Sequence, residues 1–251
     1  MKRKMRAFYL FIIITIWGCD LEKNRIENIN KRLAIANHYG NKKEFVNAIN
    51  TIDRIILDYP EYVQLYYSKA TYLALLPDKK NDAVKNLDKA IALYPEYAEA
   101  FRFRSTLKAG LDALADLDKA IELNPKFGNA FYTRAQLKFS LYDYEGALDD
   151  FDKAIKFKKL IHKDFISGIY THRALTKMNL SKYEGALADI NIAIQLDSLN
   201  PMNYRMRSAC YGKAGLFDLA DKDYAKSFEL GIDSMTSVLG VDTIAKLIPM
   251  P

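Results

Sequence analysis

The sequence is poor in the residues that build metal sites, disulfides and tight turns. Its 251 residues include two cysteines, three histidines, seven prolines and eleven glycines. Two cysteines cannot form a disulfide framework, and so few histidines and cysteines leave little material for a metal site. Scarce glycine and proline also argue against a sheet-rich protein with many turns. We therefore expect neither a bound metal nor a disulfide-stabilised fold.

Catalytic motifs are missing as well. The sequence has no pair of histidines four residues apart, no glycine-rich phosphate loop and no Gly-x-Ser-x-Gly nucleophile elbow. Its carboxylates are spread along the chain, so none stands out as a tuned acid or base. We expect no cofactor and no enzymatic activity.

Long apolar runs are also absent, since the longest, residues 7–17, has 11 residues and is broken by Thr15. A membrane-spanning helix needs about 20. With 50% hydrophobic and 27% charged residues, the composition is that of a globular protein and excludes a disordered or polytopic membrane chain. Four basic residues precede the run, as in a secretory signal: Lys2, Arg3, Lys4 and Arg6.

The apolar run ends in Ile-Trp-Gly-Cys at residues 16–19. This ending resembles the signal of bacterial lipoproteins, and the resemblance implies cleavage before Cys19 and acylation of that cysteine. It divides the chain into a signal peptide, 1–18, and an acylated cysteine with a short linker, 19–28. We expect an exported protein, lipid-anchored in the cell envelope on its periplasmic or surface side. The alternative is an uncleaved anchor with an incidental cysteine.

The positive charge of the chain belongs mostly to this signal. The net charge is +6, and the first 18 residues carry four positive charges and no acidic residue, which leaves +2 for the remainder. The sequence therefore loses its main argument for nucleic-acid binding. Cys210 would be the one remaining thiol, and we expect it to be a small buried core residue.

The remainder of the chain repeats itself. Residues 144–155 and 183–194 align almost residue for residue, and shorter copies lie at 83–91 and 113–121. An alanine recurs at spacings of 35, 30, 34, 39 and 34 residues. Small residues at fixed positions let paired helices approach closely, while large apolar residues beside them fill the groove. The alanines are Ala48, Ala83, Ala113, Ala147, Ala186 and Ala220.

This pattern resembles the tetratricopeptide repeat, a helix-turn-helix unit of 34 residues. The resemblance implies an all-α, right-handed superhelical solenoid of about six repeats over 29–234, followed by a capping helix within 235–251. The third repeat lacks about four residues near 108–111, and the fourth carries about five extra near 158–164. We expect both irregularities to bend the superhelix. The six repeats are 29–62, 63–97, 98–127, 128–166, 167–200 and 201–234.

Two charged columns run through the repeats, a basic one on each first helix and an acidic one on each second helix. The two columns change together along the chain. The second repeat has Lys69 with the neutral Asn86, and the first repeat has no charged residue in either column. This pattern favours helix-to-helix ion pairs over a cationic surface for an anionic ligand. The predicted structural residues are Arg104 with Asp116, Arg134 with Asp150, Arg173 with Asp189, and Arg207 with Asp223.

The resemblance also implies a partner-binding groove on the concave face, lined by the first helix of each repeat. Residues there vary between repeats and include the aromatic, methionine and arginine side chains that interface cores favour. Packing between neighbouring repeats is the alternative role for each of them. The candidates are Tyr67, Arg102, Phe103, Tyr132, Gln136, Phe139, His172, Met178 and Arg205.

These observations favour a non-catalytic scaffold that binds a protein or peptide of the cell envelope and is held at the membrane by its lipid. Two alternatives stay open. One is a self-assembling structural solenoid that packs through its apolar end. The other is an accessory lipoprotein for glycans or small molecules, with Tyr67, Tyr132 and Phe139 as a stacking platform. The sequence predicts no nucleic-acid partner.

Overall fold

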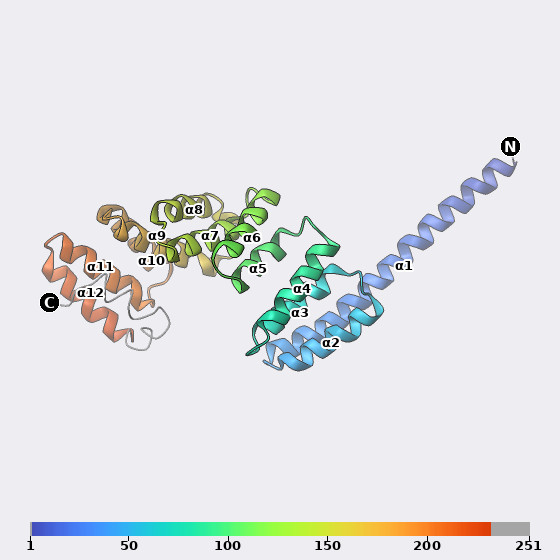
Figure 1. Cartoon of the computed structure of the whole chain (residues 1–251), viewed down its shortest axis with the longest axis horizontal. Helices are drawn as coiled ribbons and strands as arrows, with labels where there is room; N and C mark the ends of the chain where they lie inside the picture. Colours follow the sequence, from blue (N-terminus) through green and yellow to red (C-terminus); the bar gives the residue numbers. More distant parts are fainter. Residues whose placement is uncertain (1, 232–251) are drawn as a thin grey trace. The chain divides into compact units, whose positions relative to one another are not determined.

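A computed structural model describes the backbone of residues 2–231 and the side chains of residues 22–231. Within that part of the chain all regular structure is helical, and no strand occurs (Figure 1). The α-helices are α1 (Lys2–Asn41), α2 (Phe45–Asp58), α3 (Val63–Ala74), α4 (Lys80–Leu93), α5 (Ala98–Leu107), α6 (Gly110–Leu123), α7 (Gly128–Ser140), α8 (Tyr144–Lys156), α9 (Ile166–Asn179), α10 (Tyr183–Leu196), α11 (Pro201–Lys213) and α12 (Phe217–Glu229).

The helices form two compact units that divide between Leu107 and Lys108. In the first unit each helix from α1 to α5 packs against the next, and in the second the same holds from α6 to α12. Such consecutive packing of helix pairs confirms the all-α solenoid expected from the sequence. The division falls inside the short third repeat, 98–127, so that α5 lies in the first unit and α6 in the second.

The alanine column lies in the core of both units. All six alanines are at most 9% exposed, and four of them are completely buried. Large apolar side chains fill the space beside them, and Leu87, Leu117, Phe151 and Ile190 are fully buried. Small residues where helices cross and large ones alongside are what close helix packing requires.

A single residue with a positive φ angle lies in the turn between the two helices of each repeat, or in the third repeat at the first residue of the second helix. The φ angle lies between 58° and 74° at these positions. Glycine adopts this left-handed conformation without steric cost, whereas a side chain opposes it by about 1–2 kcal/mol. Only two of the six turns use glycine, and Tyr142 is the bulkiest of the other residues. The six positions are Lys43, Asp78, Gly110, Tyr142, Ser181 and Gly215.

The extra residues of the fourth repeat form two short 3₁₀ turns, Lys158–Leu160 and Lys163–Phe165. Between them Ile161 is buried and packs into the core of α7, α8 and α9. A side chain at Gly128 would collide with Ile161, so the glycine makes room for this contact. The insertion located from the sequence is therefore anchored in the core.

The N-terminal helix is longer than the sequence predicts. Residues 19–28, expected to be a linker, are helical and continuous with the first repeat as part of α1. Helical residues rise about 1.5 Å each, so residues 20–28 span about 14 Å, compared with roughly 30 Å when extended. Among the described residues, no helix combines the length and apolarity needed to cross a bilayer. The capping helix expected within 235–251 lies outside the described residues.

Candidate functional site

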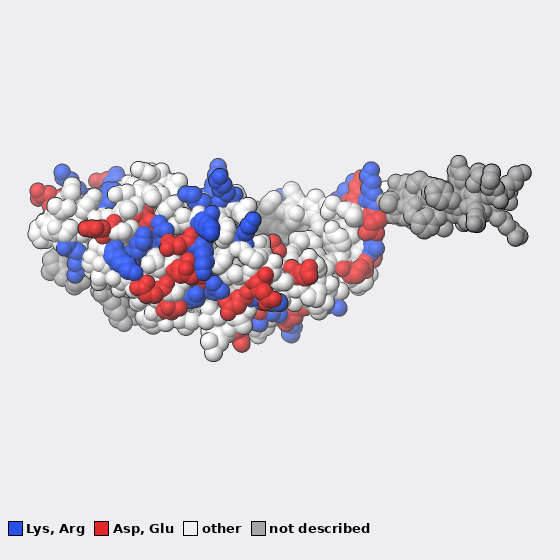
Figure 2. Space-filling model, turned by 90° about the horizontal axis from the view of Figure 1, so that it is seen from above, with Lys and Arg blue, Asp and Glu red and all other residues white. Residues whose placement is uncertain are grey.

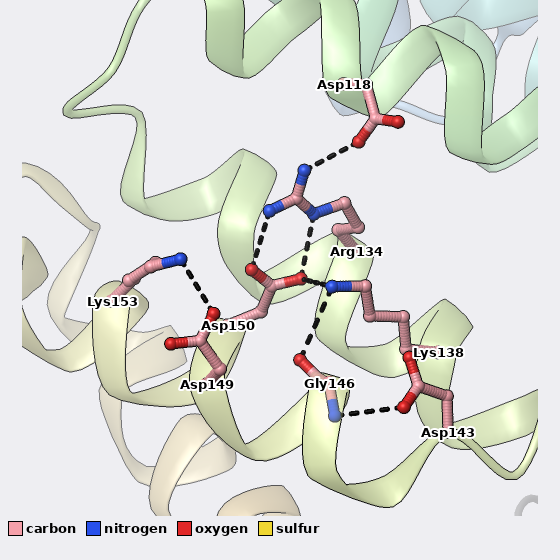
Figure 3. A network of polar contacts seen from close by, with 8 residues as sticks. All are labelled: Asp118, Arg134, Lys138, Asp143, Gly146, Asp149, Asp150 and Lys153. Carbon is pink, nitrogen blue, oxygen red and sulfur yellow. Dashed lines mark hydrogen bonds and ion pairs between the residues drawn. The ribbon is translucent and has the colours of Figure 1, made fainter.

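The charged columns meet in the second unit as a polar network (Figure 3). Arg134 on α7 holds Asp150 on α8 with two parallel bonds, 2.8 Å from Nε to Oδ2 and 2.7 Å from Nη2 to Oδ1. Its remaining Nη1 donates to Asp118 on α6 at 2.6 Å. Lys138, one turn after Arg134, reaches the same Asp150 at 2.8 Å and the carbonyl oxygen of Gly146 at 3.5 Å. One arginine therefore ties together three successive helices.

The next two repeats use the same arrangement. Arg173 forks onto Asp189 at 2.9 and 2.5 Å and reaches Asp152 at 2.6 Å. Arg207 forks onto Asp223 at 2.6 and 2.9 Å, and here Asn191 takes the third position at 2.8 Å. These three Arg–Asp pairs are the predicted ones. Of the fourth predicted pair, Arg104 contacts Asp88 in the first unit at 2.5 Å, and Asp116 contacts Lys108 in the second at 3.1 Å.

The burial of these ion pairs indicates that they stabilise the fold. The side chain of Asp150 is completely buried, and that of Arg134 is 15% exposed. Burial alone would raise the pKa of Asp150, but the hydrogen bonds from Arg134 and Lys138 hold that pKa below its ordinary value. The basic column is thus engaged with carboxylates. Figure 2 likewise shows basic and acidic side chains interleaved over the visible face.

Sequence reasoning missed a lysine that contacts the aspartate in the third, fourth and fifth repeats, whereas the sixth has Tyr211 at this position. The lysine lies four residues after the arginine, on the same helix face. The signal was readable in the sequence, since a lysine follows at this spacing in the third, fourth and fifth repeats. The lysines are Lys108, Lys138 and Lys177, which contact Asp116, Asp150 and Asp189.

Three of the predicted partner-binding residues come together in the second unit. Tyr132 and Gln136 lie one turn apart on α7, and His172 lies on α9. Gln136 Nε2 donates to the Tyr132 hydroxyl at 3.2 Å, and this hydroxyl lies 3.2 Å from His172 Nδ1. The Tyr132 and His172 rings meet edge to face with their centroids 5.7 Å apart. We call these three residues the Tyr132 cluster.

The side chains of the Tyr132 cluster are uncharged at neutral pH. Burial raises the pKa of Tyr132 to about 12 and lowers the pKa of His172 below its ordinary value. His172 Nδ1 lies 2.7 Å from the carbonyl oxygen of Gly168, which can only accept, so the proton of the neutral ring is on Nδ1. Nε2 is then an acceptor, 3.5 Å from the Gln136 amide nitrogen. The cluster offers neutral donors and acceptors beside aromatic surface.

The first unit holds a separate aromatic group. Tyr67 on α3 lies with its ring centroid 5.3 Å from that of Tyr97 and 5.6 Å from that of Phe103 on α5. Tyr97 donates to Gln64 at 2.8 Å, and burial is the main cause that raises the pKa of Tyr97 to about 12. Tyr97 was not among the predicted residues, because it precedes the helix whose spacing guided the choice. Arg102 is half-buried on α5.

The remaining candidates pack within the second unit. Met178 is 6% exposed and lies in a core cluster, which favours the packing role given as the alternative for each candidate. Phe139 meets Tyr144 across the α7–α8 turn with the ring centroids 5.2 Å apart. The Arg205 guanidinium stacks on Tyr224, 3.8 Å from the ring centroid. Tyr67 lies in the other unit from Tyr132 and Phe139, so the three do not form a platform within one unit.

Cys210 is the cysteine whose side chain the structure describes. Cys210 is fully buried, and burial raises its pKa to about 11, which keeps the thiol protonated. This confirms its expected place in the core. No group of three or more metal-ligating side chains occurs among the described residues. The side chain of Cys19 lies outside them.

Comparisons with known proteins identify the fold. No protein-family profile matches the sequence, and no curated protein matches it. Solved structures do. The chain is similar to the APC/C hetero-tetramer Cut9–Hcn1, with 14% identity, 86% of this chain and 42% of that chain covered, and a TM-score of 0.69. It thus spans less than half of that chain.

Two smaller proteins are covered over most of their length. One is YrrB, described as a tetratricopeptide-repeat protein with an unusual peptide-binding site. The match has 16% identity and a TM-score of 0.58, and it covers 76% of this chain and 97% of that chain. The other is a tetratricopeptide-repeat protein from Parabacteroides merdae. That match has 18% identity and a TM-score of 0.58, and it covers 86% of this chain and 81% of that chain. At such identities the likeness establishes the fold alone, and that fold is the tetratricopeptide repeat.

Proposed function

We propose that this tetratricopeptide-repeat chain is a non-catalytic adaptor that binds a protein segment through the first helices of its repeats. The Tyr132 cluster carries the proposal, because it joins side chains from the first helices of two successive repeats. The same residues vary from repeat to repeat, unlike the packing columns. A structurally similar protein, YrrB, is described as having a peptide-binding site, which supports a peptide as the partner.

The chemistry of the cluster indicates what kind of segment it would bind. Tyr132, Gln136 and His172 present neutral hydrogen-bonding groups, and the pKa shifts of Tyr132 and His172 keep them uncharged near neutral pH. Such groups suit backbone amides or uncharged polar side chains, whereas the arginines that could attract an anion hold carboxylates of the chain itself. The partner segment is accordingly neutral and partly apolar where it meets this cluster.

We also propose that the protein acts at a membrane of the bacterial envelope, anchored by acylation of Cys19. The basic residues, the short apolar run and the Gly-Cys ending support this location. Two or more acyl chains on the same cysteine would give a stable anchor. With residues 20–28 helical, the first repeat would start about 14 Å from the acylated residue. The partner would then be a neighbouring envelope protein.

Site-specific photo-crosslinking tests the adaptor proposal. A photoreactive phenylalanine analogue replaces Gln136 in the cluster, and as a matched control it replaces Asp149, an exposed residue of the second helix in the same repeat. We expect irradiation of native membranes to attach another envelope protein to position 136 and not to position 149. A Tyr132→Phe/His172→Phe background, which removes the polar atoms but keeps the rings, should reduce this product.

Other outcomes would contradict the proposal in distinct ways. Equal crosslinking from both positions would show that the cluster has no special role. If position 136 captures only a second copy of the chain, the protein assembles with itself. A wild-type chain that incorporates no labelled fatty acid at Cys19 would refute the lipid anchor while leaving the adaptor role intact.

A further inference from the structure

The second repeat departs from the polar network at three positions that belong together. Its basic residue is Lys69 where the fourth repeat has Arg134, and its second-helix residue is Asn86 where that repeat has Asp150. The lysine that completes the network is replaced by Leu73. A shorter cation, a neutral amide and an apolar side chain cannot rebuild a bidentate pair with its supporting lysine.

A cavity of about 350 Å³ lies where that network is missing, between α2, α3 and α4 of the first unit. Its apolar surface comes from Val46 and Ile49 on α2 and from Leu73 and Leu76 at the end of α3. Ile49 and Leu73 are 9% and 6% exposed, so this surface continues into the core. The volume is within the range of small-molecule sites, which are mostly apolar with a few placed polar groups.

The polar lining of the cavity carries an excess of positive charge. Three lysines and two aspartates face it. Lys69 is matched by Asp53 at 2.5 Å. Lys79 and Lys85 share the single carboxylate of Asp82, at 3.2 and 3.8 Å. One positive charge therefore remains beside the apolar surface.

The start of α4 adds to this charge. The helix begins at Lys80, and the residue before it, Lys79, gives no side-chain cap to the first-turn amides. Those N–H groups carry the positive end of the helix dipole. Both Lys79 and Asp82 belong to this start and line the cavity. An anionic group at this end would meet two ammonium groups and the helix terminus, next to an apolar surface.

We propose that this cavity binds a small amphipathic carboxylate, an alkyl or aryl acid whose apolar body packs against Ile49 and Leu73 and whose carboxylate lies between Lys79 and Lys85. This site is independent of the Tyr132 cluster, which lies in the other unit. A carboxylate fits better than a cation because the lysines outnumber the aspartates. An apolar body fits better than a sugar because the deepest lining side chains are aliphatic.

Chain length sets the expected affinity. A ten-atom ligand such as octanoate would bind with a Kd on the order of 1 mM. Each methylene group buried against the aliphatic surface strengthens binding by about 4-fold. Octanoate should therefore bind up to about 15-fold more tightly than hexanoate, until the cavity is full. Two rim lysines should favour octanoate over the neutral octanamide by about 5-fold.

Methyl NMR of the full, unlipidated chain tests the site, with hexanoate, octanoate and octanamide as probes. We expect octanoate to shift the methyl signals of Ile49 and Leu73 saturably, with the stated dependence on chain length. In a Lys79→Gln/Lys85→Gln variant, octanoate should bind no more tightly than octanamide, because one lysine and two aspartates would remain in the lining. Absence of a saturable shift at these methyls up to 20-fold above the expected Kd, about 20 mM, would overturn the proposal.

A variant that fills the cavity is the matched control. Lys69→Arg, Leu73→Lys and Asn86→Asp together restore the network of the fourth repeat, so the fold is kept while the space is occupied. We expect this variant to lose the octanoate response at Ile49 and to melt no lower than the wild type. An unchanged response at Ile49 would refute the site.

A peptide identifies the source of the carboxylate. An acetylated tetrapeptide that ends in leucine with a free carboxylate offers the same chemistry as part of a polypeptide. Saturation of the Ile49 shift by octanoate but not by the peptide supports a small acid. Saturation by the peptide alone would overturn it in favour of a chain terminus. Neither result affects crosslinking from position 136, so failure here is separable from failure of the adaptor role.

Discussion

Adjacent aspartates on α8 provide the sharpest test of the polar network. Asp149 and Asp150 are the same residue type on the same helix, but their surroundings differ. The side chain of Asp149 is 62% exposed and pairs with Lys153 one turn away, while that of Asp150 is fully buried and accepts from Arg134 and Lys138 (Figure 3). The same substitution, aspartate to asparagine, can be made at both positions and changes neither size nor helix.

The expected cost differs about tenfold. Breaking a buried ion pair costs about 3–5 kcal/mol, because a charge is left without its partner. In Asp150→Asn the new amide would keep one acceptor oxygen, and Arg134 would keep Asp118, so we expect the low end, about 3 kcal/mol. An exposed pair one turn apart on a helix contributes about 0.3–0.5 kcal/mol, which is the expected cost of Asp149→Asn.

Thermal unfolding followed by circular dichroism measures both variants under the same conditions. For a chain of this size, 1 kcal/mol corresponds to about 2–4 °C in Tm. We expect Asp150→Asn to lower Tm by about 6–12 °C and Asp149→Asn by about 1 °C. A Tm for Asp150→Asn within 2 °C of the wild type would refute a structural role for the network, as would equal losses at the two positions.

Three further perturbations test local features of the second unit. Tyr142→Gly should raise Tm by about 2 °C, because the positive φ angle costs a tyrosine about 1 kcal/mol and costs glycine nothing. A lower Tm would show that the contacts of the Tyr142 ring stabilise the fold by more than this backbone cost. Asp143 accepts from the backbone of Gly146 as the N-cap of α8, so Asp143→Ala should cost about 1 kcal/mol, and an unchanged urea midpoint would exclude a capping role. Burial lowers the pKa of His172, so the unfolded chain binds the proton first. As the pH falls from 7.5 to 5.5 the wild type should lose up to about 1.4 kcal/mol that a His172→Phe variant keeps, and parallel pH profiles would contradict this.

The sequence predicted the ion pairs because their two columns change together. Lys69 and Asn86 depart from the pattern in the same repeat, and covarying positions imply contact even when nothing else is known. The additional partner of Arg134, Asp118 on the preceding helix, was not predicted. The side chain of Asp118 is 63% exposed on its own helix, and only the packing of successive helices brings it within reach of the arginine.

Periodicity was less able to separate accessible from buried positions on one helix. Met178 follows Ala174 by four residues, so the two lie on the same helix face, and that face is turned to the core. The spacing from Ala174 therefore already favoured a packing role for Met178. Tyr132 and Gln136 are also four residues apart. Their contact with His172 depends on how α7 and α9 pack, which no single helix specifies.

Both proposed sites lie at positions that the packing columns leave free to vary. Positions that stay constant, such as the alanines and the Arg–Asp pairs, use their surface to hold helices together and leave none for a ligand. At Leu73 and Asn86 the network is absent, and a cavity replaces it. Tyr132 and His172 stand at first-helix positions whose residues vary from repeat to repeat, and they contact each other across two repeats. Restoring the network at Lys69, Leu73 and Asn86 should therefore abolish binding in the cavity and leave the fold unchanged, whereas damage to a constant position such as Asp150 should lower stability first.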